Sequence, residues 1–113
     1  LRHRARWVGF NCMGDDGAAT RRVGSFAGTS GLYDLAGNVA ELTADRFAAY
    51  GAAPCWGAAT PRDPLCATSS ATITVRGGSY LDDATLLRSA SRTQSADMTA
   101  SPRVGFRCAR AVP

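Results

Sequence analysis

Residues 31–45, GLYDLAGNVAELTAD, are the stretch on which the expected fold depends most. Two further segments rich in glycine, serine and arginine follow it, TVRGGSYLDDATLLRSASR at 74–92 and SPRVGFRCAR at 101–110. Because Gly, Asn and Asp favour turns, residues 37–49 predict a short helical or irregular turn. The chain shows no long amphipathic helix pattern, so we expect little helix.

Three β-strands are expected in the second half of the chain, at 71–78, 86–92 and 104–110. Alternation places Ile73 and Val75 on one face of the first strand, and Val104, Phe106 and Cys108 on one face of the last. The intervening QSADMTASP is polar and predicts a turn. Residues 50–70 predict an inserted surface loop. The pattern therefore predicts a loop-rich β or α+β domain whose small antiparallel sheet lies in the C-terminal half.

The size and charge of the chain limit the number of domains it can form and the kinds of partner it can bind. It has 113 residues and a formal net charge of +4, which allows one domain. The arginines are scattered and no lysine accompanies them, so nucleic-acid binding is not expected. No apolar run is long enough to span a membrane. Because the chain starts at Leu1 without a signal peptide, we expect upstream processing or truncation.

The four cysteines favour disulfides over metal binding, because no CxxC motif or histidine pair accompanies them. Cys55 and Cys66 bracket a proline-containing loop and predict one disulfide. Cys12 and Cys108 then pair with each other, or Cys108 pairs with something outside this chain. Four buried thiols are the alternative. Disulfides would indicate an extracytoplasmic or secreted protein.

The motifs together resemble the formylglycine-generating enzyme family, also called the sulfatase-modifying-factor family, and we expect a bacterial protein. Its pattern is GLYDMxGNVWEWT, VxRGGSW/Y, LRxAxR and GFRxAR, and VGSF at 23–26 matches a preceding segment. The resemblance implies a variant of the C-type lectin fold with a small twisted antiparallel sheet. It also implies that residues 1–113 are the C-terminal part of one domain, completed by an upstream segment or a separate chain.

The resemblance also shows where this chain departs from the copper-dependent members, which oxidise a substrate cysteine to formylglycine with two cysteines. Those two positions fall on Asp82 and Leu87, and Ala40 and Leu42 replace two aromatic residues of the substrate groove. Copper(I) prefers sulfur ligands. We therefore expect no copper, no catalytic residues and no oxidase activity.

A calcium site is the part of the family chemistry that we expect this sequence to retain. The resemblance assigns it to the carboxylates of Asp34 and Glu41 and to the carbonyls of Gly37 and Val39, oxygen ligands of the kind that calcium takes. The alternative is that Asp34 and Asn38 only make turns and that Glu41 is solvated.

A ligand groove is expected around the RGGSY motif, with Ser79, Tyr80, Asp82 and Arg88 as its candidate residues. The neighbouring Asp82 and Asp83 are expected to face apart rather than form an acid–base pair. The other arginines of the motifs, Arg76, Arg92 and Arg107, are expected to tie loops together.

Two functions follow from these expectations. The first is a non-catalytic binding or scaffold module with a protein or glycan ligand, since loops on a rigid core adapt readily to binding. The alternative is a fragment of a split or processed enzyme, whose missing groups come from another segment.

Overall fold

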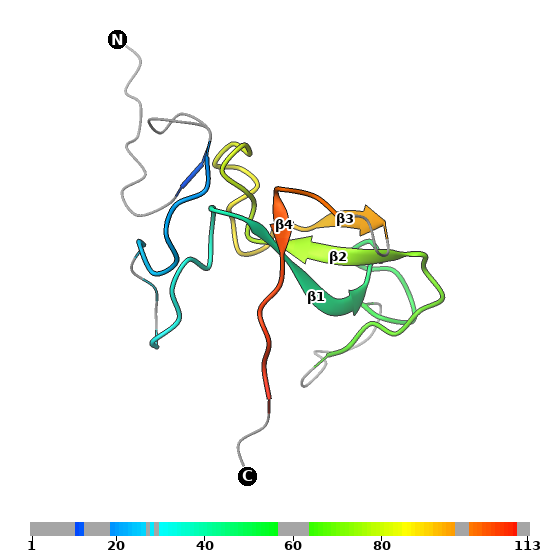
Figure 1. Cartoon of the computed structure of the whole chain (residues 1–113). Helices are drawn as coiled ribbons and strands as arrows, with labels where there is room; N and C mark the ends of the chain where they lie inside the picture. Colours follow the sequence, from blue (N-terminus) through cyan, green and yellow to red (C-terminus); the bar gives the residue numbers. More distant parts are fainter. Residues whose placement is uncertain are drawn as a thin grey trace.

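The computed structural model describes residues 11–12, 19–26, 28, 30–56, 64–96 and 100–110. Its four strands are β1 (Ala40–Arg46), β2 (Thr72–Arg76), β3 (Thr93–Ala96) and β4 (Val104–Gly105). They form one sheet in the order β3-β2-β1-β4, from which loops extend on both sides (Figure 1). The described residues contain no helix, so none of them forms a membrane-spanning helix.

The sheet is mixed rather than antiparallel. β1 pairs with β2 and β2 with β3 in antiparallel fashion, but β4 runs parallel to β1, with Ala40 opposite Val104. The chain leaves β3 at one edge of the sheet and returns as β4 at the other edge, and this crossover makes the last pair parallel. The loop-rich fold with little helix is confirmed, and the small sheet is mixed because one of its three strand pairs is parallel.

β1 occupies the segment where we expected a helical or irregular turn. Its sequence, AELTADR, includes residues that tolerate helices. Pairing with β2 overrides this local preference, because β2 supplies hydrogen-bond partners along the strand. The register shifts between Leu42 and Arg46, and Thr43 stabilises the irregularity by donating its hydroxyl to the Thr74 carbonyl.

The later strands are shifted or shortened relative to the expectation. Residues 86–90 form turns and bends, residues 91–92 have no regular structure, and β3 begins only at Thr93, partly within the segment predicted as a turn. β4 has two residues, after which Phe106 is 75% exposed and Cys108 is also exposed. The predicted shared face of Val104, Phe106 and Cys108 is therefore wrong, because the strand ends before the alternation places Phe106 against the sheet.

The best sequence prediction is β2, inside the expected strand at 71–78. Val75 is buried and Ile73 is half-buried, but Thr74 on the opposite face is also fully buried. A strand in the centre of a sheet is covered on both faces, so alternation alone underestimates its burial.

The buried interior of the described residues is small and unusually polar. Its apolar members are Cys12, Ala40, Cys66 and Val75, and its polar members are Asn11, Asn38, Thr74 and Ser79. Small apolar side chains remove little surface from water. Hydrogen bonds among the buried polar groups and covalent closure therefore carry a large share of the structural specificity.

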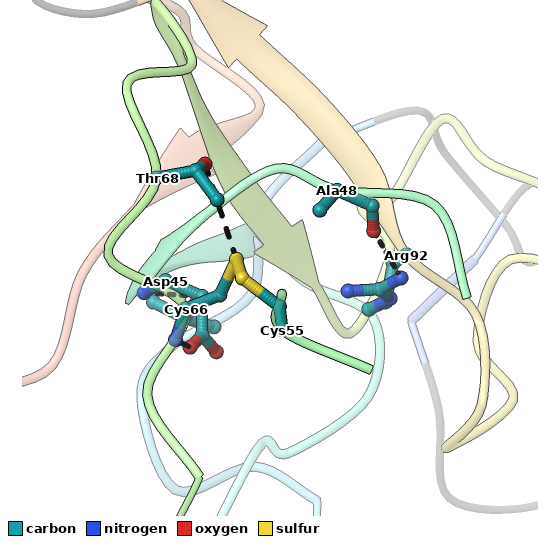
Figure 2. The surroundings of a disulfide bond; sticks show 7 residues. Asp45, Ala48, Cys55, Cys66, Thr68 and Arg92 are labelled. Atoms are coloured by element: carbon teal, nitrogen blue, oxygen red, sulfur yellow. Dashed lines mark hydrogen bonds between the residues drawn. A yellow bond between two sulfur atoms is a disulfide. The ribbon is translucent and has the colours of Figure 1, made fainter. Parts of the chain in front are cut away.

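The predicted disulfide between Cys55 and Cys66 is present, with a Cα–Cα distance of 5.2 Å. Cys66 is fully buried at the end of β1, where its N–H donates to Asp45 and its carbonyl accepts from the Arg46 N–H, both at 2.8 Å (Figure 2). A loop of this length contributes about 2–3 kcal/mol in the chain-entropy model.

The predicted disulfide between Cys12 and Cys108 is wrong. Cys12 and Cys108 are not joined, because Cys12 is buried whereas Cys108 lies on the exposed C-terminal segment. Elimination by counting cysteines gives no information on where the two side chains lie in space.

Arg92 holds the disulfide loop against the end of the sheet. Its guanidinium carbon lies 3.8 Å from the ring centre of Tyr50 and 5.1 Å from that of Trp56, and Nη2 donates to the Ala48 carbonyl at 2.7 Å (Figure 2). Stacking on aromatic faces is favourable for arginine. Arg92 therefore ties loops together, as expected for this arginine of the motif.

Candidate functional site

The segment 31–39 owes its shape to four residues with positive φ: Gly31 at 77°, Asp34 at 53°, Gly37 at 79° and Asn38 at 66°. Asp and Asn tolerate this backbone region better than most residues. At Gly37 a Cβ atom would lie 2.3 Å from the Asn11 carbonyl oxygen, so only glycine fits. The AGN part of the motif therefore produces a tight turn against residue 11.

Asn38 is the centre of a buried hydrogen-bond network. Its Oδ1 accepts from the Arg21 N–H at 2.9 Å and lies 3.5 Å from Asn11 Nδ2, and its Nδ2 donates to the Arg21 carbonyl at 3.3 Å. Its own N–H donates to the Asn11 carbonyl and its carbonyl accepts from the Tyr80 N–H, both at 2.9 Å. One side chain and its peptide groups thus connect three distant segments.

Asp34 and Glu41, the carboxylates assigned to calcium, bind different partners. Asp34 accepts from the N–H groups of Gly24 and Phe26, at 2.6 and 3.1 Å. Both Glu41 oxygens accept from Arg107 Nε, at 2.9 and 2.8 Å. These bonds to Glu41 raise the pKa of Arg107 above its ordinary value, and burial opposes the shift.

These contacts show whether the four expected ligand residues could hold a calcium ion. The oxygen types are those that calcium takes, but both carboxylates already accept hydrogen bonds from N–H donors. No three His, Cys, Asp or Glu side chains gather into a metal-binding group within the described residues. With Arg107 in place the residues do not fit the ion, and calcium binding by Asp34, Gly37, Val39 and Glu41 stays a prediction.

Asp82, at the first of the two cysteine positions, closes a tight turn. Its Oδ2 accepts from the N–H and the hydroxyl of Ser79, at 2.7 and 2.8 Å, and its Oδ1 lies 3.7 Å from Arg103 Nη1. Ser79 is fully buried. Its hydroxyl is therefore a structural donor and is closed to a substrate.

Leu87, at the second position, packs on glycine. A Cβ at Gly78 would lie 2.9 Å from Leu87 Cδ1, so the absence of a side chain at Gly78 makes room for the leucine. Asp83 faces away from Asp82, as expected, and accepts from the hydroxyl and the N–H of Thr85. These bonds lower the pKa of Asp83 below its ordinary value.

An open cleft of about 290 Å³ lies between β3 and β4. Asp82 lies on its wall with a set of residues that share the same opening: Ala40, Val75, Leu86, Thr93, Gln94, Ser95, Ser101, Arg103 and Val104. Of the four groove residues predicted from the sequence, only Asp82 belongs to this lining. Ser79 lies in the buried turn, Tyr80 bonds through its N–H to Asn38, and Arg88 is exposed and donates to the Thr85 carbonyl.

Sequence reasoning missed Gln94 and Arg103, which are brought to the cleft by β3 and by the residue before β4. The only sequence signal for them was their position close to the RGGSY motif and the GFR motif. The crossover from β3 to β4, which brings residues of both segments to the cleft, was not encoded in any local pattern.

The comparisons with known proteins identify the family. Residues 2–112 match the model described as the sulfatase-modifying factor enzyme 1-like domain, so the chain belongs to this FGE-sulfatase family. No curated protein matches the chain in sequence.

Two solved structures resemble the fold. Treponema denticola variable protein 1 is 28% identical with a TM-score of 0.73, over 85% of this chain and 34% of that protein. PvdO from Pseudomonas aeruginosa is 27% identical with a TM-score of 0.66, over 87% of this chain and 36% of that protein. The chain thus spans about a third of the length of each.

Replacing the central amide tests the network directly. We expect Asn38→Ala to lower the free energy of unfolding by about 2–3 kcal/mol, because the buried Asn11 side chain and the backbone of Arg21 lose hydrogen-bond partners. Chemical denaturation measures the change, with Ser69→Ala, an exposed position, as the control. A loss no larger than that of the control would contradict the central role of Asn38.

Proposed function

We propose that this domain is a non-catalytic binding module of the sulfatase-modifying-factor family, and that it takes an extended polypeptide in the cleft between β3 and β4. The observation that supports the proposal most directly is the set of contacts that the Asp82 carboxylate makes. Its carboxylate closes the turn at Ser79 and faces Arg103 on the cleft wall, where the oxidases of the family have a cysteine.

The chemistry around this position supports the absence of copper oxidation. A carboxylate and a leucine offer no soft sulfur ligand. Cys66 is in the disulfide, Cys12 is buried, and neither Cys12 nor Cys108 lies among the residues that line the cleft. A serine mechanism is not supported either, because Ser79 is buried and donates to Asp82.

The composition of the cleft supports a polypeptide ligand. Its apolar part comes from Val75, Leu86 and Val104, and its polar part from the side chains of β3. β3 is an edge strand of the sheet, and an edge strand offers backbone groups to an added extended segment. Arg103 is half-exposed and supplies a charge that fixes the orientation of a ligand.

A second surface supports the proposal that another polypeptide segment completes the domain. Leu32, Tyr33, Leu35 and Phe106 are between 42% and 75% exposed, and Arg107 joins the C-terminal segment to Tyr33. A group of large exposed apolar side chains indicates an interaction surface. The two similar structures are longer than this chain, which agrees with the proposal of an additional segment. The disulfide is consistent with an extracytoplasmic location, which we propose for the protein.

Oxidase activity is tested with copper and a CxPxR peptide under air. We expect the peptide thiol to persist, because the two cysteine positions hold Asp82 and Leu87. Mass spectrometry of the peptide measures the outcome, with the peptide and copper alone as the control. Protein-dependent conversion of the cysteine to an aldehyde would contradict the non-catalytic assignment.

Peptide binding is tested by selecting a displayed random-peptide library on the domain. We expect selected peptides to lose about tenfold in affinity for Arg103→Glu, because the charge on the cleft wall is reversed. Arg110→Glu has the same charge change outside the cleft lining and is the matched control. Equal binding to both variants, or failure to select any peptide, would contradict the proposal. A glycan that requires Arg103 would instead favour a lectin function.

The completing segment is tested by native mass spectrometry of the protein isolated from its source. We expect a polypeptide with the N-terminal motifs of the family to remain bound, because it would cover the apolar surface at Tyr33 and Phe106. Peptide sequencing identifies it, and Phe106→Ser is expected to weaken its retention. A folded chain that runs alone under native conditions would contradict this part of the proposal.

A further inference from the structure

The loop that follows β1 is fastened to the segment before β3 by a group of contacts at Arg92. The guanidinium carbon lies 3.8 Å from the ring centre of Tyr50 and 5.1 Å from that of Trp56. Nη2 donates to the Ala48 carbonyl, and the Tyr50 hydroxyl donates to the Ala90 carbonyl at 3.0 Å. We call the side chains of Tyr50, Trp56 and Arg92 the Arg92 clamp. It holds the residues that lead directly into β3.

The Arg92 clamp buries polar atoms without giving them partners. Trp56 Nε1 and the Nε and Nη1 atoms of Arg92 are buried and have no hydrogen-bond partner within the described residues. Such donors oppose the packing that buries them, because water would accept their hydrogen bonds in an open arrangement. Stacking of the rings on the guanidinium offsets part of this cost. The closed position of the loop is therefore expected to depend on a further tie.

That tie is the disulfide between Cys55 and Cys66. Cys55 directly precedes Trp56 in the chain. The N–H of Cys66 donates to Asp45 of β1 at 2.8 Å (Figure 2). The disulfide thus attaches the indole ring of the clamp covalently to the sheet. Without the bond, the loop gains conformational freedom, and water can reach the unpaired donors of the clamp.

The Arg92 clamp adjoins the cleft between β3 and β4. Thr93 follows Arg92 in the chain and pairs with Val75 of β2. Thr93 also lines the cleft, together with Gln94 and Ser95 of the same strand. β3 has only four residues and one neighbouring strand, so its position depends strongly on how its first residue is held. Release of the clamp is therefore expected to loosen this side of the cleft.

We propose that the Cys55–Cys66 disulfide is a redox switch for the cleft, and that its reduction opens the Arg92 clamp and weakens peptide binding. The inference rests on the peptide-binding function proposed for this cleft. The reductant is a dithiol of the kind that thiol–disulfide oxidoreductases carry.

The reduction is a thiol–disulfide exchange. Cys66 is fully buried whereas Cys55 is half-buried, so the first thiolate of the dithiol attacks Cys55 Sγ. The Cys55–Cys66 bond breaks, a mixed disulfide forms at Cys55, and Cys66 leaves as a thiolate that takes up a proton. The second thiolate of the reductant then displaces Cys55, which also takes up a proton. The protein gains two electrons and two protons, and the reductant becomes a disulfide.

The experiment measures the affinity of a peptide selected on the oxidised chain, before and after treatment with dithiothreitol. Intact mass spectrometry confirms the gain of two hydrogen atoms by the chain. We expect the affinity to fall about tenfold on reduction and to recover on reoxidation, because a loosened wall must be ordered when the ligand binds. Cys108→Ser removes the exposed free thiol and is expected to respond like the unaltered chain.

Hydrogen exchange in the absence of peptide gives a readout that does not depend on the ligand. We expect reduction to accelerate exchange at the amides of β3 and to leave that of Leu42 in β1 unchanged. Unchanged exchange of β3, or unchanged peptide affinity, in a folded and fully reduced chain would overturn the switch. Failure of the oxidised chain to bind any peptide would contradict the proposed function, whereas the exchange measurement decides separately whether the disulfide controls β3.

A variant with the disulfide intact applies if the reduced chain does not fold. Trp56→Leu removes the indole ring from the Arg92 clamp, and we expect it to lose about as much peptide affinity as reduction does. Leu65→Ala changes an exposed side chain next to Cys66, outside the clamp, and is the matched control. Equal affinity and equal exchange of β3 in the two variants would overturn the proposal.

Discussion

The hydrogen bonding of Asn38 is the constraint on which the rest of the described structure depends. Its amide and peptide groups bind Asn11, Arg21 and Tyr80, which come from separate parts of the chain. A buried amide is costly unless its donors and acceptors are paired. The segments must therefore meet in one arrangement, and the position of Tyr80 in turn places the RGGSY turn beside the start of β1.

This dependence follows from the small apolar interior. Ala40 and Val75 bury little surface, whereas Asn11, Asn38, Thr74 and Ser79 are buried and polar. Hydrogen bonds are directional, so a polar interior specifies loop positions that an apolar one would leave adaptable. The disulfide has the same effect on the loop after β1, because Cys66 is bonded both to Cys55 and to the end of that strand.

The candidate site shows what a carboxylate does at the position of Asp82. Asp82 satisfies the turn at Ser79 and presents its other oxygen to Arg103, so the position becomes part of a polar cleft wall. Glu41 is a similar case, because its carboxylate accepts hydrogen bonds from Arg107, which follows β4 in the chain. In both places an ion pair or turn within the chain occupies a position that the family resemblance assigned to metal chemistry.

The sequence by itself determined the family, the loop-rich fold, the central strand β2 and the Cys55–Cys66 disulfide, because these depend on ordered motifs, local alternation and short spacing. The sequence also pointed to Asp82, and the structure places this residue in the lining of the cleft. Only the tertiary structure decided that 40–46 is a strand, that β4 runs parallel to β1, and that Cys12 and Cys108 stay apart. It also decided that Gln94 and Arg103 share a cleft and that Arg107 closes the loop at Glu41. The physical reason is that strand pairing and ion pairing join residues far apart in the chain, and local sequence patterns carry no information on such contacts.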